Sequence, residues 1–180
     1  MEEVSLVNAP ESIENPYFKD LDSYIFKSSI SIYSHDLSGI LVIKKLSNTS
    51  CRVAFTTEFG NTLLDMTITP TGYEKHFAIQ KLDRKVILKT LAKDIRALTA
   101  NDLTAKKAFR QGEKEVLMGN LNKFQLYYFF KLGRLKQILK TTKNKEKLKI
   151  QFSFDEVGQL NLINLAHEGI ALNIQLRPID

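Results

Sequence analysis

Apolar and polar side chains alternate along most of this chain, and one segment has a different period. Over residues 83–99, DRKVILKTLAKDIRALT, apolar residues recur every three or four positions, which is the spacing of one stripe of an α-helix. The stripe consists of Val86, Ile87, Leu91, Ala92, Ile95 and Leu98, and Lys85, Lys89, Lys93 and Asp94 fall elsewhere around the helix. Asp83 is predicted to be the N-cap, because its carboxylate can accept a backbone hydrogen bond in the first turn. The pattern predicts an amphipathic helix that lies on an apolar surface.

Before this helix, a period of two predicts five short antiparallel strands joined by tight turns. These strands cover residues 24–33, 40–46, 51–59, 62–69 and 73–79. The residues predicted to point to one side are Phe26, Ile30, Ile32, Val53, Phe55, Leu64, Met66 and Phe77. Residues 1–23 contain two prolines and mixed polar residues, which predicts an irregular leader with one helical turn near residues 17–21.

After the helix, a hairpin is predicted to turn at residues 111–113, and a second meander of strands follows. In its later strands Ile150 and Phe152 share one face, as do Leu172 and Ile174. An open sheet beyond ~10 strands tends to curl or split. The sequence therefore predicts a mainly β protein: an antiparallel, strongly curved open half-barrel of about 11 to 12 strands, with the helix against its concave face. Residues 24–180 are predicted to form this single domain.

Composition sets few further limits. A chain of 180 residues is large enough for one domain with one core. Lys and Arg exceed Asp and Glu by 26 to 20, and this excess of +6 is typical of a solvated surface. Cys51 is the only cysteine, so no internal disulfide forms. No apolar run approaches a membrane span of ~18 residues, and the first residues are acidic, unlike the basic start of a secretory signal.

The sequence offers no recognisable catalytic constellation. Ser34, His35 and Asp36 have the residue types of a hydrolase triad, but triads assemble from distant positions and these neighbours are predicted to form a turn. His76 and His167 lie in separate strands without metal-ligand spacing. No glycine-rich phosphate loop is present. We therefore expect a non-enzymatic protein with no metal and no cofactor.

Two surface features suggest partners. The aromatic residues 127–130, with Lys123, Lys131 and Arg134 nearby, have the composition of a stacking platform for single-stranded nucleic acid. The favoured interpretation is that the aromatics fill both faces of a buried sheet, because the basic residues lie at the strand ends. The lysine-rich segment 140–149 is interpreted as a solvated turn, and it also allows contact with an anionic membrane surface.

A family resemblance rests on two stretches: SGILVIKKLSNTSCRVAFTTEFGNTLLDMTIT (residues 38–69) and KLDRKVILKTLAKDI (residues 81–95). Their order, a sheet meander followed by a helix inside the curve and then more sheet, resembles LolA/LolB-like proteins. FTTEFGN (residues 55–61) resembles an uncharacterised lipoprotein branch of that superfamily. The resemblance implies a periplasmic protein, anchored to the outer membrane as a lipoprotein, whose partner is a lipid or an acylated protein.

The functional prediction is an apolar cavity on the concave face, which holds acyl chains and is gated by the helix. The predicted lining is Phe26, Ile30, Ile32, Val53, Phe55, Leu64, Met66, Phe77, Ile87, Leu91, Ile95, Ile150, Phe152, Leu172 and Ile174. Burial of acyl methylenes, at about 0.8 kcal/mol each, needs no catalytic residue. Two alternatives stay open. In one, the same side chains fill the core and the protein is a structural or interaction module. In the other, which is less favoured, the chain binds single-stranded nucleic acid.

Overall fold

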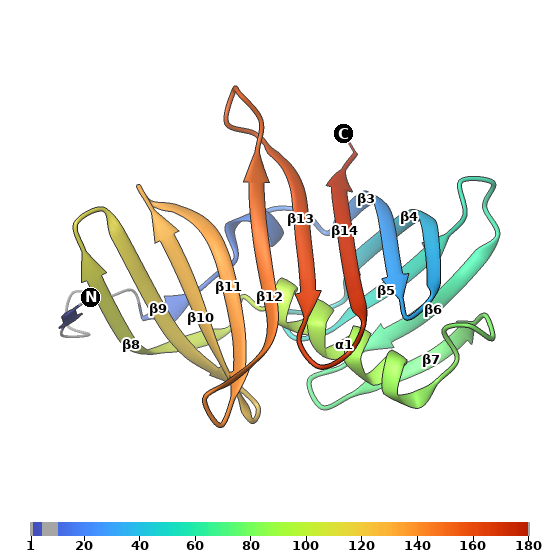
Figure 1. Cartoon of the computed structure of the whole chain (residues 1–180), viewed down its shortest axis with the longest axis horizontal. Coiled ribbons are helices and arrows are strands. Elements are labelled where there is room, and N and C mark those ends of the chain that lie inside the picture. The colour runs from blue at the N-terminus through green and yellow to red at the C-terminus, as the bar shows by residue number, and fades with distance from the viewer. Residues whose placement is uncertain (1, 5–10, 180) are drawn as a thin grey trace.

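A single antiparallel sheet, curved around one helix, makes up nearly all of the structure (Figure 1). The computed structural model describes residues 2–4 and 11–179. The sheet has 14 strands in the order β1-β8-β9-β10-β11-β12-β13-β14-β3-β4-β5-β6-β7, with β2 paired to β8 beside this path. The two ends of the path, β1 and β7, do not pair with each other, so the barrel is open. The prediction of a mainly β, curved half-barrel with one helix is confirmed.

The strands form two meanders on either side of the helix. The first meander contains β3 (Ser23–Ile32), β4 (His35–Lys45), β5 (Cys51–Thr56), β6 (Thr62–Ile68) and β7 (Tyr73–Ala78). The second contains β8 (Leu103–Gln111), β9 (Lys114–Leu121), β10 (Phe124–Lys131), β11 (Arg134–Thr142), β12 (Lys145–Phe154), β13 (Leu160–His167) and β14 (Leu172–Pro178). The last strand pairs with the first strand of the other meander, where Ile174 lies opposite Ile30. This long-range pairing joins the two meanders into one sheet.

The concave face is apolar because strands of period two align their inward residues in register. One row of cross-strand partners runs through seven neighbouring strands and every member is buried: Leu117, Tyr128, Ile138, Ile150, Leu165, Ile174 and Ile30. A second row crosses the other meander with Phe26, Leu41, Phe55 and Leu64. Apolar cross-strand pairs each contribute roughly 0.2–1 kcal/mol, so this register stabilises the curve as well as the core.

Turn residues fix where the strands end. Leu132–Gly133 and Lys143–Asn144 both have positive φ at two successive positions, which is the geometry of the type I′ turns that match the twist of hairpins. Gly39 of β4 has a different role. A Cβ at this position would lie 1.9 Å from the backbone oxygen of Thr56, so only glycine fits where β4 passes the end of β5.

Helix α1 (Lys85–Thr99) lies inside the curve, as predicted, but its first turn differs from the prediction (Figure 1). Arg84 is the N-cap residue, and it makes no side-chain capping bond. The predicted cap, Asp83, instead accepts two hydrogen bonds from Lys75 Nζ at 2.8 and 3.0 Å. Val86, which was assigned to the apolar stripe, is 52% exposed. The stripe therefore contacts the sheet only from Ile87 onward.

The N-terminal segment, predicted to be an irregular leader, also contributes to the sheet. Its short strands β1 (Glu2–Val4) and β2 (Ser12–Ile13) pair with β8, and a 3-10 helix covers Pro16–Phe18. These two strands account for the difference between the 12 strands with a sequence pattern and the 14 in the structure. Residues 1 and 5–10 of the predicted leader lie outside the described part of the chain. Two- and three-residue strands are too short to leave a periodic signal.

Candidate functional site

The residues predicted to line a cavity lie inside the half-barrel, with one exception. Fourteen of them are at most 5% exposed and belong to one hydrophobic cluster. They are Phe26, Ile30, Ile32, Val53, Phe55, Leu64, Met66, Ile87, Leu91, Ile95, Ile150, Phe152, Leu172 and Ile174. In this conformation the residues of the helix and those of the sheet form one core, so an acyl chain would enter only where the helix moves away.

Phe77 is the exception, because it is 46% exposed on the other side of the sheet. The register of β6 and β7 shifts between Asp65, which pairs with Phe77, and Met66, which pairs with Lys75. One extra residue on β7 is a β-bulge, and a slip of one residue exchanges the two faces of a strand. Ala78, rather than Phe77, therefore packs against the core. The assignment of Phe77 to the lining was wrong.

A cleft of about 670 Å³ opens along α1 from Lys85 to Arg96. One wall is the helix, with Lys85, Lys89, Ala92, Lys93 and Arg96, and the other wall comes from two hairpin turns of the sheet. The turn residues are Ile68, Thr69, Pro70, Thr71, Gly72 and Tyr73 on one side and Leu121, Asn122, Lys123 and Phe124 on the other. Asn122 Nδ2 donates to the backbone oxygen of Pro70 at 3.2 Å and so bridges the two turns. The cleft is lined by both basic and apolar side chains.

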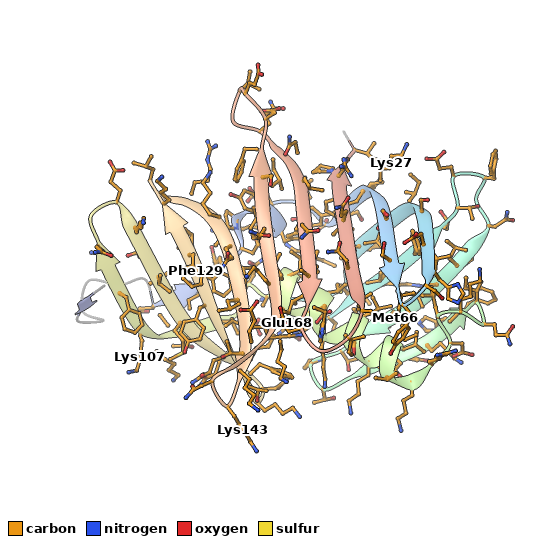
Figure 2. All side chains as sticks on the ribbon, viewed as in Figure 1. Lys27, Met66, Lys107, Phe129, Lys143 and Glu168 are labelled. Atoms are coloured by element: carbon orange, nitrogen blue, oxygen red, sulfur yellow. The ribbon has the colours of Figure 1, made fainter. Side chains whose placement is uncertain are left out.

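An ion pair between α1 and the sheet is buried close to this cleft. Lys140 Nζ on β11 donates to Asp94 Oδ1 at 2.5 Å, and the two side chains are 3% and 1% exposed. His167 Nε2 lies 3.9 Å from the same oxygen, while Asp94 Oδ2 has no partner among the described residues. Burial raises the pKa of Asp94, and the Lys140 ammonium opposes this shift. Lys140 therefore does not belong to the solvated turn predicted over residues 140–149, whereas Lys143 lies at the exposed hairpin tip (Figure 2).

The end of α1 is held by hydrogen bonds from the N-terminal segment. Asn15 Nδ2 donates to the backbone oxygen of Leu98 at 2.7 Å, and Asn101 Oδ1 accepts from the Asn15 backbone nitrogen at 2.6 Å. Asn101 Nδ2 donates to the backbone oxygen of Phe18 at 2.8 Å. These bonds satisfy carbonyls and amides that the helix end and the irregular chain leave unpaired. The C-terminal half of α1 is therefore fixed on several sides.

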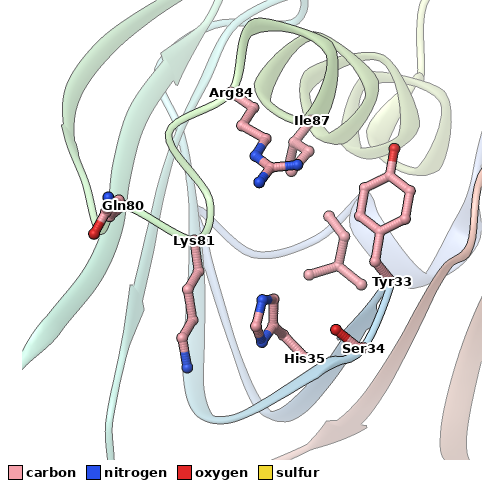
Figure 3. Close-up of a pocket in the computed structure, with 8 residues that line it drawn as sticks. Tyr33, Ser34, His35, Gln80, Lys81, Arg84 and Ile87 are labelled. Carbon is pink, nitrogen blue, oxygen red and sulfur yellow. The ribbon is translucent and has the colours of Figure 1, made fainter.

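A second pocket, of about 330 Å³, lies where the chain enters α1 (Figure 3). Tyr33 and Ser34 of the β3–β4 turn and His35 at the start of β4 face Lys81 and Arg84 across it. No hydrogen bond joins Ser34, His35 and Asp36 in the described structure. Asp36 instead accepts from Ser31 Oγ at 2.6 Å. The three neighbouring residues therefore do not assemble a hydrolase triad. The predicted turn over them was wrong in part, because only Ser34 lies in the turn and strand β4 already begins at His35.

The aromatic strand β10 uses its residues on both faces of the sheet. Tyr128 is fully buried, and burial raises the pKa of its hydroxyl. Phe129 is on the opposite face, where it is half-buried (Figure 2). A base cannot stack on a ring that has no exposed face, so Tyr128 is not part of a nucleic-acid platform. This arrangement agrees with the favoured interpretation of the four adjacent aromatics.

The remaining candidate groups for chemistry are dispersed. His76 is exposed and its Nε2 lies 2.8 Å from Thr67 Oγ1. Cys51 is buried, and burial raises its pKa to about 11, which keeps the thiol protonated. Within residues 2–4 and 11–179, His, Cys, Asp and Glu form no group of three or more with metal-site geometry. In the same residues no helix is long and apolar enough to cross a membrane.

Comparison with known proteins supports a relationship at the level of the fold. No family model and no curated protein matches the chain. The structure is similar to that of LolA superfamily protein NE2245 from Nitrosomonas europaea, with a TM-score of 0.52 and 8% sequence identity, over 88% of this chain and 84% of that one. This chain has a LolA-like fold. A DUF1329 family protein from Desulfovibrio piger aligns with a TM-score of 0.46 and 8% identity, over 91% and 86% of the two chains.

Sequence reasoning missed two charged residues inside the LolA-like half-barrel, although a signal for each was present. Asp94 follows Leu91 by three positions and precedes Leu98 by four, so it lies on the apolar stripe and not beside it. Lys140 follows the buried Ile138 by two positions, so it points to the same face of β11. Two opposite charges at inward-facing positions indicate a buried pair, because an unpaired charge is rarely buried.

Proposed function

We propose that this protein binds a hydrophobic ligand, a lipid or the acyl chains of a lipidated protein, between the concave face of the half-barrel and helix α1. Helix α1 acts as the gate. The observation that carries the proposal is the uneven attachment of this helix: its first half has no side-chain cap and borders a cleft, and its second half is buried and bonded. A helix held in this way can open at one end without leaving the sheet.

The chemistry of the interior supports an apolar ligand. The lining consists of aliphatic and aromatic side chains, and each methylene that leaves water contributes about 0.8 kcal/mol. A twelve-carbon chain would gain roughly 9 kcal/mol before the cost of moving the helix is subtracted. Such binding is non-directional and requires no catalytic group, so we propose a binding protein and not an enzyme. By its fold, we further propose that it acts in the periplasm as an outer-membrane-anchored lipoprotein of an uncharacterised branch.

A specific observation favours one alternative function. The predicted lining residues are already at most 5% exposed in the present conformation, which is also expected of an interaction module with a permanently filled core. In that case α1 is a fixed part of the core and no ligand enters. The two functions differ in whether the helix opens, so a binding measurement separates them.

The test is a titration with a fluorescent fatty-acyl probe, such as a dansyl-labelled undecanoic acid below its critical micelle concentration. We expect saturable binding, together with a rise in the melting temperature, because a ligand that binds only the folded state stabilises it. Leu91→Phe with Ile95→Phe is expected to abolish binding, because the larger side chains would occupy the space that opens when the helix moves away from the sheet. Circular dichroism checks that this variant still folds. Absence of binding to the folded wild-type protein would leave the filled-core module.

A further inference from the structure

The cleft beside α1 combines cations and apolar surface in an ordered way. Lys85, Lys89 and Lys93 follow one another at intervals of four residues, so they share one face of the helix along the cleft. Lys123 reaches the same space from the β9–β10 turn on the opposite wall. The same cleft is also lined by apolar or aromatic side chains, which we call its apolar floor: Ile68, Tyr73, Ala92, Leu121 and Phe124. Positive charge and apolar surface within one cleft match the two parts of an anionic amphiphile.

The positive charge of this cleft is not balanced from within. Five basic residues line it and no acidic residue does. Among the ion pairs between described residues, none involves Lys85, Lys89, Lys93 or Lys123. The nearest helix carboxylate, Asp94, is bound to Lys140. Like charges at four-residue spacing destabilise a helix by roughly 0.2–0.5 kcal/mol per pair, so the lysine row is a local cost that an anion would remove.

Two details of the cleft walls also point to an anion. Burial lowers the pKa of Lys93, and the ammonium groups of Lys89 and Lys123 lower it further. Arg96, at the inner end of the cleft, is only 7% exposed, and its Nε has no hydrogen-bond partner among the described residues. Its Nη2 is held by Asp102 at 3.0 Å. The buried guanidinium therefore keeps one donor unused beside the cleft.

We propose that this cleft binds the phosphate-bearing headgroup of a lipid, with the alkyl chain passing over the apolar floor toward the concave face. The proposal rests on the function proposed above and specifies the class of its ligand. A phosphate monoester carries about −1.5 to −2 charges at pH 7 and three acceptor oxygens, enough to contact several lysines at once. A carboxylate carries one charge and two oxygens. Lysine binds phosphate as a point charge, so no bidentate geometry is needed.

Three probes separate the headgroup from the chain in a calorimetric titration of the full chain: dodecyl phosphate, dodecyl maltoside and inorganic phosphate. We expect dodecyl phosphate to bind at least roughly tenfold more tightly than dodecyl maltoside at ~50 mM salt, and the ratio to shrink at ~500 mM salt because the lysines are screened. Inorganic phosphate alone should bind more weakly than dodecyl phosphate by a larger factor, since it leaves the floor empty.

A charge-matched pair of variants locates the site. Lys89→Ala with Lys93→Ala is expected to reduce the affinity for dodecyl phosphate to that for dodecyl maltoside. Lys44→Ala with Lys131→Ala removes the same charge from exposed positions outside the cleft and should leave the preference unchanged. Lys44, Lys131 and Lys89 are exposed and Lys93 is half-buried, so melting curves check that both variants fold.

Four other outcomes would each contradict the inference, and each has a different meaning. Equal binding of the two dodecyl probes would refute headgroup recognition and leave hydrophobic binding intact. Binding of neither dodecyl probe would refute both the inference and the proposed function. Inorganic phosphate that binds as tightly as dodecyl phosphate would show a free-anion site, and loss of preference in the Lys44/Lys131 variant would show a diffuse charge effect. Either of these results would exclude the lipid headgroup as the ligand of this cleft.

Discussion

The two halves of helix α1 meet very different surroundings. From Lys85 to Lys93, three lysines and Val86 face solvent or a cleft, and the first turn is uncapped. This part contacts the sheet through apolar side chains and through Lys93, whose Nζ lies 5.4 Å from the centroid of the Phe124 ring. From Asp94 to Leu98 every residue is buried, and the chain just beyond is tied by side-chain hydrogen bonds to the N-terminal segment. Local stability follows buried contacts and protected hydrogen bonds. The comparison therefore indicates a helix that is anchored at its C-terminal end and opens from its N-terminal end.

The largest expected effect comes from breaking the anchor. Asp94→Ala is expected to lower the free energy of unfolding by about 3 to 5 kcal/mol, because it leaves the Lys140 side chain buried without its partner. On the other half, Val86→Ala should change it by no more than about 0.5 kcal/mol. Urea denaturation measures both.

The control for Asp94→Ala is the double variant Asp94→Leu with Lys140→Met. Replacing a buried ion pair by apolar residues of similar volume is often neutral or stabilising, so most of the lost stability should return. If Asp94→Ala costs no more than Val86→Ala, the ion pair is not the anchor and the comparison of the two halves is wrong.

An intermediate effect is expected from the hydrogen bonds at the helix end. Asn101→Ala removes two part-buried bonds and should cost about 1 to 3 kcal/mol, because their partners lose their hydrogen bonds. Asn122→Ala is the matched change beside the cleft, where its one bond to Pro70 is exposed. We expect this second change to cost less than about 1 kcal/mol. If the two variants lose the same stability in thermal unfolding, the hydrogen bonds at the C-terminal end of α1 are no stronger an attachment than the bond beside the cleft.

A smaller, stabilising effect should follow from giving α1 the cap that it lacks. Arg84→Ser places a hydroxyl at the N-cap and is expected to add about 0.5 to 1 kcal/mol locally. Hydrogen exchange of the first-half amides should slow, while amides after Asp94 should be unaffected. Arg84→Ala is the control, since it removes the same charge without capping. Slower exchange in both variants would attribute the effect to charge instead of capping.

The finest test is a difference in pH dependence. Burial raises the pKa of Asp94, whose carboxylate faces Lys140, with His167 and Lys93 nearby, so the folded state holds a proton to higher pH than the unfolded chain. Stability from this source is full below the unfolded pKa of about 3.9 and is lost as the pH rises through the folded pKa. The stability difference between wild type and Asp94→Asn should therefore fall as the pH rises above the unfolded pKa of about 3.9. If this stability difference instead increases with pH, the pKa of Asp94 is lowered in the folded state and the prediction is wrong.

The sequence by itself determined the period of the strands, the position of the helix and the resulting curved sheet. A period of two repeated over twelve segments leaves one apolar face on each strand, and a single stripe of period 3.6 fits only against that face. For the same reason most of the predicted lining, such as Phe55 and Ile150, lies in the interior. These features depend on the spacing of apolar residues within each segment, and this spacing can be taken directly from the sequence.

Only the tertiary structure decided which positions depart from that spacing and what they meet. The bulge on β7 turned Phe77 outward, because one extra residue exchanges the two faces of a strand. Asp94 and Lys140 are 46 positions apart, and only the packing of α1 on β11 brings them to 2.5 Å. The tertiary structure also brings Lys85, Lys89 and Lys93 into one cleft with apolar side chains from two distant hairpins. Charge partners and cleft walls come from elements that are far apart in the sequence. A hydrophobic pattern along the chain predicts each element but not which elements pack together.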